Sequence, residues 1–230
     1  MIAPSILNAN NIDLKNDIEN AVQAGISRFH IDIMDGHFVP NLSFGPQLIK
    51  DFKREFPMTD AEIHLMSDAP DKLVPAFVSA GADLVELHYE AMDKPKLYYW
   101  FDYLASNGVD AALAISPDTP VEVVEPYLPL LKQVLVMTVK PGFGGQSFLP
   151  ESVSRIKSVR EIVGSDFDIE VDGGINDQTI KLAENAGANI NDQTIKLAEN
   201  AGANIFVVGS YLYENGDVGS QVHKLEKIIK

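Results

Sequence analysis

The sequence predicts a single α/β domain, residues 1–230, in which eight parallel strands alternate with helices and close into a (β/α)8 barrel. Short apolar runs alternate with stretches of helical periodicity, which is typical of successive βαβ units. Turn glycines at Gly25, Gly81 and Gly108 lie 56 and 27 residues apart, so one unit takes about 27–28 residues. Eight such units fill most of the chain, and its 46% hydrophobic content excludes intrinsic disorder.

The eight predicted strands are short runs rich in β-branched and apolar residues. Most are apolar at successive positions, as expected for a parallel sheet that is buried on both faces. In chain order the predicted strands are 2–7, 29–34, 62–66, 84–88, 111–115, 134–139, 168–171 and 205–208.

The segments between these strands are predicted helices. Residues 14–26 and 153–163, for example, place apolar side chains at helical spacing. Glycines after several helices fit the left-handed position that follows a helix, where other residues pay a steric cost; they are Gly25, Gly81, Gly108 and Gly202. An open doubly wound sheet is compatible with this alternation, but eight units of nearly constant length favour the closed TIM barrel.

A tandem repeat interrupts the regular spacing. Residues 175–189 read INDQTIKLAENAGAN, and residues 190–204 repeat the same fifteen letters. Because removing one copy restores the unit length, we expect one copy to form the helix between the seventh and eighth strands. We expect this to be the first copy, which stays joined to residues 172–174. Docking of the second copy, or one longer helix made from both, are the alternatives.

Composition excludes several classes of function. The chain has 18 Lys and Arg against 33 Asp and Glu, a net charge of −15, which disfavours nucleic acid and anionic membranes as partners. The absence of cysteine excludes disulfides, cysteine-ligated metals and thiol nucleophiles. No apolar run approaches the roughly 18–20 residues of a membrane helix, and the N-terminal segment has no signal-peptide pattern. We therefore expect a cytoplasmic protein.

Four side chains that can bind a metal lie near the predicted carboxyl ends of three strands. His30 and Asp32 share one face of the second strand, His64 lies at the end of the third, and Asp172 ends the seventh. A closed barrel would bring them around one axis. Two imidazoles and two carboxylates suit one divalent metal ion, with Zn²⁺ favoured and Fe²⁺, Mn²⁺ or Co²⁺ as alternatives. The structural alternative is a buried His–Asp pair and an ordinary Asp-Gly turn.

Glycine-containing loops follow the last three predicted strands. They are Gly142, Phe143, Gly144 and Gly145 within residues 141–146, then Gly173 and Gly174, then Gly209 and Ser210. Bare glycines let backbone N–H groups approach an anion, and barrels often hold phosphate after strands seven and eight. We therefore expect a phosphorylated substrate, although flexible turns explain each loop taken by itself.

Other notable residues are interpreted as structural, except for three methionines that have both a structural and a functional interpretation. Met34, Met66 and Met137 either fill gaps in the core or form an apolar wall around the reacting carbon. The histidines His37, His88 and His223 are interpreted as structural or surface residues. The aromatic run at 98–101 is assigned to packing or to a subunit contact, and we expect a homo-oligomer.

Five sequence blocks together resemble the ribulose-phosphate 3-epimerase family. They are APSIL at 3–7, HIDIMDGHFVPN at 30–41, HLM at 64–66, MTV at 137–139 with PGFGGQSF at 141–148, and VDGGI at 171–175. The resemblance implies a TIM-barrel isomerase of the pentose phosphate pathway that converts D-ribulose 5-phosphate to D-xylulose 5-phosphate. Allulose-6-phosphate 3-epimerases share much of the pattern, but Gly144 and Gly174-Ile175 look more like the pentulose enzyme.

The resemblance also implies residue roles by motif match. His30, Asp32, His64 and Asp172 would bind the metal, and Ser5 and His64 would contact the substrate. The sugar phosphate would be lined by Gly142, Phe143, Gly144, Gly145, Asp172, Gly173, Gly174, Gly209 and Ser210. Two positions depart from the family pattern: Lys140 stands where Asn is usual, and Ile-Ser-Pro at 115–117 replaces Leu-Asn-Pro.

The implied chemistry requires two catalytic acids. Inverting a carbon next to a carbonyl removes a proton from one face and returns one to the other. We assign Asp32 as the base and Asp172 as the acid, with an enediolate between the two steps. The alternatives are an allulose-6-phosphate 3-epimerase and a metal-free phosphosugar-binding barrel. A Schiff-base enzyme is disfavoured because no Lys lies inside a predicted strand; Lys140 ends the sixth.

Overall fold

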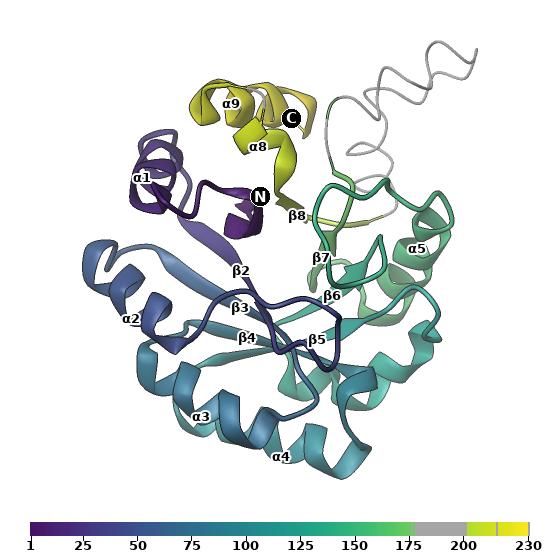
Figure 1. The fold of residues 1–230 in the computed structure, drawn as a ribbon. Helices are drawn as coiled ribbons and strands as arrows, with labels where there is room; N and C mark the ends of the chain where they lie inside the picture. Colours follow the sequence, from purple (N-terminus) through teal and green to yellow (C-terminus); the bar gives the residue numbers. More distant parts are fainter. Residues whose placement is uncertain (176, 178–201, 215, 230) are drawn as a thin grey trace, which may run out of the picture.

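The computed structural model describes residues 1–175, 177, 202–214 and 216–229. Eight parallel strands surround one axis and helices cover the outside (Figure 1). The strands are β1 Ile2–Pro4, β2 Arg28–Met34, β3 Asp60–Met66, β4 Leu84–His88, β5 Asp110–Ile115, β6 Gln133–Met137, β7 Asp168–Asp172 and β8 Ile205–Val208. All eight predicted strands are present.

The sheet nearly closes on itself. Its strand order is β1-β8-β7-β6-β5-β4-β3-β2, and every neighbouring pair is parallel. A parallel bridge between Ser5 and His30 joins the two remaining edges, just after β1 and within β2. The predicted TIM barrel is therefore confirmed, and the open-sheet alternative is excluded.

Helices alternate with the strands around the outside. Within the described part of the chain the α-helices are α1 Leu14–Gln23, α2 Pro46–Glu55, α3 Pro70–Ala80, α4 Lys94–Ser106, α5 Ser152–Val163, α8 Ser210–Glu214 and α9 Val218–Ile229. Three 3₁₀ helices are η1 Ile6–Asn8, η2 Tyr89–Ala91 and η3 Val121–Leu130. The segment between β5 and β6 is 3₁₀ rather than α because Pro126 and Pro129 cannot donate a backbone hydrogen bond. No helix among the described residues is long and apolar enough to cross a membrane.

The first predicted strand is too long by three residues. β1 ends at Pro4, and Ser5 then caps η1, its Oγ accepting a hydrogen bond from the Leu7 N–H at 3.3 Å. A serine that caps a helix turns the chain away from the sheet. The consequence is functional, since this turn brings residues 5–8 over the carboxyl ends of the strands.

Side chains that point out of the strands form the main core against the helices. Ile31, Ile63 and Val85 are fully buried in this layer, as are Phe77 of α3 and Phe101 of α4. Trp100 is also buried, while Tyr99 is 61% exposed, so the aromatic run at 98–101 divides between core and surface. The strand residues that point inward are the ones that build the site.

The tandem repeat lies mostly outside the described residues. Ile175, Asp177 and residues 202–204 are described, and Ile175 is buried. Which of the copies 175–189 and 190–204 packs on the barrel therefore stays a prediction.

The predicted turn glycines adopt the left-handed conformation. Gly25, Gly81, Gly108 and Gly202 have φ values of 97°, 100°, 71° and 114°. Among the described residues, every positive φ belongs to a glycine. After α1, α3 and α4, these turns set the point at which the helix ends and the next strand begins.

We expect Gly108→Ala to lower the free energy of unfolding by about 1–2 kcal/mol, because an L side chain is strained at positive φ. Gly45→Ala is the matched control: Gly45 has φ −135°, and at both positions no described heavy atom outside the local chain lies within 4 Å of an added Cβ. Chemical denaturation measures both variants, and the control should change by less than about 0.5 kcal/mol. Equal losses in the two would show that φ is not the cause.

Candidate active site and metal centre

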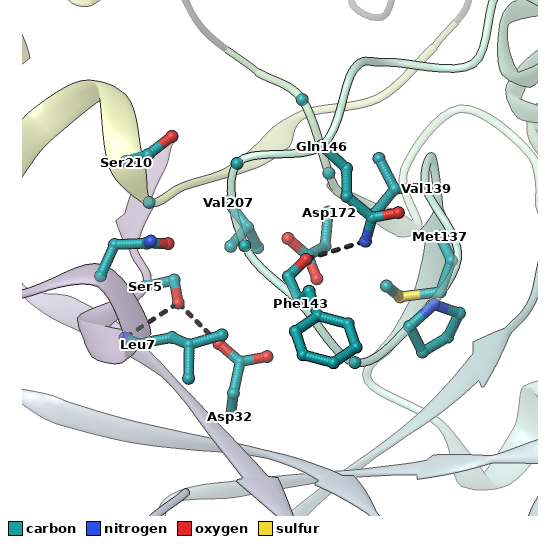
Figure 2. A pocket seen from close by; sticks show the side chains of 18 of the residues that line it. Ser5, Leu7, Asp32, Met137, Val139, Phe143, Gln146, Asp172, Val207 and Ser210 are labelled. Atoms are coloured by element: carbon teal, nitrogen blue, oxygen red, sulfur yellow. Dashed lines mark hydrogen bonds between the residues drawn. The ribbon is translucent and has the colours of Figure 1, made fainter. Parts of the chain in front are cut away.

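A cavity opens at the carboxyl ends of the strands. Loops after β1, β6, β7 and β8 form its walls, and side chains from β2, β3 and β6 reach it from below (Figure 2). Met34, Met66 and Met137 line it and are almost fully buried, which fits the apolar-wall interpretation. This is the end of the barrel where TIM-barrel enzymes place their chemistry.

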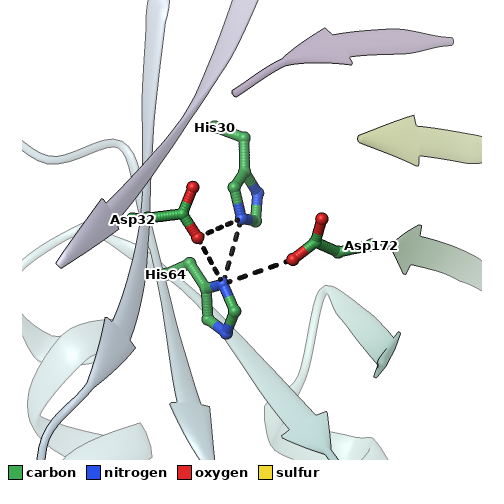
Figure 3. A group of neighbouring side chains, drawn as sticks. All are labelled: His30, Asp32, His64 and Asp172. Atoms are coloured by element: carbon green, nitrogen blue, oxygen red, sulfur yellow. Dashed lines mark hydrogen bonds and ion pairs between the residues drawn. The ribbon is translucent and has the colours of Figure 1, made fainter. Parts of the chain in front are cut away.

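Four predicted metal ligands meet beneath this cavity (Figure 3). His64 Nδ1 lies 3.1 Å from both His30 Nε2 and Asp32 Oδ1, and 3.9 Å from Asp172 Oδ2. His30 Nε2 is 3.6 Å from Asp32 Oδ1, and one donor atom from each residue falls within 4.8 Å of all the others.

These distances fit a bound divalent ion. Donor atoms about 2.0–2.2 Å from a tetrahedral zinc lie roughly 3.3–3.6 Å apart, close to the spacing observed. Two imidazole nitrogens and carboxylate oxygens also converge on one point, where their lone pairs would repel one another without a cation. His30, Asp32, His64 and Asp172 can therefore hold a metal of the predicted class.

A buried layer of glutamates orients His30 through its Nδ1 atom, on the side of the ring away from the other metal ligands. Its Nδ1 lies 3.0 Å from Glu62 Oε1, and 3.5 and 3.6 Å from oxygens of Glu170 and Glu86. A carboxylate at Nδ1 favours the tautomer with a proton there, which leaves Nε2 unprotonated and able to bind a metal.

The glutamate layer is stabilised by Arg28 and Gln133. Arg28 donates to Glu62 Oε2 at 3.1 Å, and the two N–H donors of Gln133 Nε2 lie within hydrogen-bond distance of Glu62, Glu86 and Glu170. Burial, with Glu62 as a neighbour, raises the pKa of Glu170 to about 8, so this carboxyl is protonated at neutral pH. Neutral and cationic partners thus limit the negative charge of a layer that contains three buried carboxyl groups.

The sequence analysis missed this layer, although the alternation of a strand indicates it. Glu62, Glu86 and Glu170 each lie two residues before an inward-pointing polar side chain, namely His64, His88 and Asp172. Residues two apart on a strand share a face, so the glutamates had to point into the barrel as well.

The two aspartates have opposite protonation tendencies. Burial raises the pKa of the Asp32 carboxyl, but the neighbouring imidazoles of His30 and His64 outweigh burial and place it well below its ordinary value. The Ser5 hydroxyl also donates to Asp32 Oδ2 at 2.6 Å (Figure 2). Burial raises the pKa of Asp172 to about 7, and the charge of Asp32 adds to this effect. Near neutral pH one acid is charged and the other is partly protonated.

The glycine loops pack closely against one another around the cavity. A Cβ on Gly174 would lie 2.2 Å from the Phe148 backbone nitrogen, so the loop after β7 can approach the loop after β6 only as glycine. A Cβ on Gly144 or Gly209 would lie 2.2 or 2.8 Å from Asn8 Oδ1. The sequence analysis missed Asn8, which η1 carries to the cavity wall between these two loops.

The loop after β6 is held in place by amide side chains. Gln146 Nε2 donates to the carbonyls of Lys140 and Phe143 at 2.7 and 2.8 Å, and Asn41 Nδ2 donates to the Gly142 carbonyl at 2.9 Å. The Phe143 side chain is left 54% exposed at the mouth of the cavity.

Most of the predicted substrate-binding residues line this one cavity. They are Ser5, Gly142, Phe143, Gly144, Gly145, Asp172, Gly173, Gly174, Gly209 and Ser210. His64 is different: it is fully buried among the metal ligands and lies outside the cavity lining. His64 thus lies where it can hold a metal, and its contact with the substrate stays a prediction.

His88 is a structural residue of the interior, one of the two interpretations given to it. It is fully buried, and its Nε2 lies 2.8 Å from Nε2 of His64. His37 and His223 are exposed, as expected. The polar side chain of His88 follows Glu86 on the inward face of β4, and this alternation is the signal that would have identified it.

Solved structures with the same fold have other reported activities. The 3-keto-L-gulonate-6-phosphate decarboxylase from Vibrio cholerae superposes with a TM-score of 0.71 at 14% identity, covering 100% of this chain and 96% of that one. A 3-hexulose-6-phosphate synthase superposes with a TM-score of 0.66 at 17% identity, covering 100% and 98%. At such low identity these likenesses support the fold alone.

Sequence relatives are far more similar. The ribulose-phosphate 3-epimerase from Bacillus subtilis is 42% identical over 194 residues, which is 82% of this chain and 87% of the relative. The one from Buchnera aphidicola is 36% identical over 229 residues, covering 98% and 93%. The model of the ribulose-phosphate 3 epimerase family matches residues 1–213. The chain therefore belongs to the ribulose-phosphate 3-epimerase family.

Proposed function

We propose that this chain is a metal-dependent isomerase that inverts carbon 3 of D-ribulose 5-phosphate to give D-xylulose 5-phosphate. The observation that carries this proposal is the pair Asp32 and Asp172, which reach one cavity from β2 and β7 with pKa values displaced in opposite directions. Membership of the epimerase family and the names of the sequence relatives support the same reaction.

The two acids divide the proton transfer between them. Asp32, held charged by the imidazoles and by Ser5, accepts the proton from carbon 3, which is acidic because it lies next to the carbonyl. Asp172, which reaches the same cavity from β7, gives a proton to the opposite face of the enediolate. The reverse reaction exchanges the two roles.

A divalent metal held by His30, Asp32, His64 and Asp172 would supply positive charge that stabilises the enediolate oxygens. The donor set favours Zn²⁺, with Fe²⁺, Mn²⁺ and Co²⁺ as alternatives. Met34, Met66 and Met137 border the reacting carbon with apolar surface, so that the two aspartates exchange protons with the substrate without competing groups.

The substrate phosphate would bind at the glycine loops. Gly144, Gly174 and Gly209 leave space at the cavity wall where side chains would clash with Asn8 or Phe148, and their bare backbone can approach an anion.

We further propose that the protein is a cytoplasmic homo-oligomer.

We expect Asp32→Asn and Asp172→Asn each to lower turnover by several orders of magnitude, because each removes one of the two proton carriers. Incorporation of solvent deuterium at carbon 3 measures this with ribulose 5-phosphate, and with allulose 6-phosphate for comparison. Asp168→Asn, at the opposite end of β7, is the matched control and should stay within about twofold of the wild type.

Near-normal turnover in either aspartate variant would reject the two-acid scheme. Faster exchange with allulose 6-phosphate than with ribulose 5-phosphate would keep the chemistry and reassign the substrate.

We also expect about one divalent ion per chain, bound more tightly as the pH rises from 6 to 7. Because Asp172 is protonated below its pKa of about 7, a proton must leave before this carboxylate can bind the ion, which costs roughly tenfold in affinity per pH unit. Calorimetric titration with Co²⁺ at several pH values measures the slope. Asp172→Asn has no carboxyl proton to release at this position, so the variant should show a slope shallower by about one log unit per pH unit. Identical slopes would contradict the role of Asp172 as a ligand.

A further inference from the structure

His64 is connected to a chain of buried polar groups on the side away from the other metal ligands. Its Nε2 lies 2.8 Å from His88 Nε2, and His88 Nδ1 lies 3.0 Å from Glu90 Oε2. Glu90 Oε1 accepts hydrogen bonds from the Ser116 backbone N–H at 2.9 Å and from the Thr119 hydroxyl. The chain therefore runs from the metal site through β4 and η2 to the loop after β5.

The geometry of these contacts allows one arrangement of protons when both rings are neutral. Although burial opposes it, hydrogen bonds from His88 and Thr119 lower the pKa of Glu90 to about 2, so Glu90 is a carboxylate and accepts. His88 then donates through Nδ1 and accepts through Nε2. The one hydrogen between the two Nε2 atoms must come from His64, whose Nδ1 is left unprotonated and faces Asp32 and His30.

Ring packing fixes the orientation of His88. The His64 and His88 rings are stacked, with centroids 5.0 Å apart and an interplanar angle of 26°. Phe38, from the loop after β2, covers His88 with a centroid distance of 4.9 Å. His88 is fully buried, so its position is held by these rings and by Glu90.

We infer that His88 and Glu90 are positioning residues that hold His64 in the tautomer and orientation required for metal binding. This inference rests on the proposed metal-dependent function. It gives His64 the same support that Glu62 gives His30, since each imidazole is oriented by a carboxylate, directly for His30 and through a second imidazole for His64.

The test is Co²⁺ binding by purified protein, measured by competition with a chelator and by the visible absorption of the bound ion. His88→Leu removes the acceptor for His64 Nε2–H and should weaken Co²⁺ binding about 10–100-fold and change the absorption spectrum. His88→Gln retains one acceptor and one donor and should recover most of the affinity. Glu90→Gln, which keeps the size of the side chain, should weaken binding by a smaller factor and serves if His88→Leu fails to fold.

Leu87→Ala is the matched control for loss of packing. Leu87 is fully buried on the same strand but packs in the helix-facing core, away from His64. This variant should lower the midpoint of unfolding while leaving Co²⁺ affinity and spectrum unchanged.

Two results would overturn the roles of His88 and Glu90 without overturning the proposed metal dependence. One is wild-type Co²⁺ affinity and spectrum in both His88→Leu and Glu90→Gln. The other is a loss of Co²⁺ affinity in Leu87→Ala as large as that in His88→Leu. If the wild-type protein bound no Co²⁺ or other divalent ion, the proposed metal dependence would be overturned together with these roles.

Discussion

The interior of this barrel is constrained by the burial of two imidazoles and two carboxylates around one point. Such groups are costly inside a protein unless each has a partner or a cation. His30 has Glu62, His64 has His88, and Asp32 has Ser5. Even the layer beneath them, where three carboxyl groups meet, is stabilised by Arg28 and Gln133. The inward face of several strands is therefore polar, and the apolar core lies between strands and helices.

Barrel closure is what turns distant segments into one site. His30 and Asp172 are far apart in the sequence, and they meet because β2 and β7 lie on the same closed wall. The loops above the strands are brought together in the same way, since Gly144 and Gly209 both pack against Asn8 near the N-terminus. The aspartates at the strand ends and the glycine loops thus border one cavity.

Local patterns were sufficient to predict the strands, the left-handed turn glycines and the quartet His30, Asp32, His64 and Asp172. Each of these depends on periodicity or on position at a strand end. The partner of each polar group could not be predicted, because pairing across a barrel depends on strand register and stagger. The alternation along β4 places His88 and Glu86 on its inward face, but it does not say with which groups they pair. The segment 121–130, by contrast, could have been predicted correctly. Its two prolines are visible in the sequence, and they prevent the α-helix that we expected there.

The most direct test of a metal ion shared by Asp32 and Asp172 is anomalous X-ray diffraction at the zinc absorption edge, from crystals of the Zn²⁺-loaded protein. We expect one strong anomalous peak between Asp32 and Asp172, within bonding distance of His30 Nε2 and His64 Nδ1. A peak confined to the glutamates below, or strand ends in which these two acids share no ion, would contradict it.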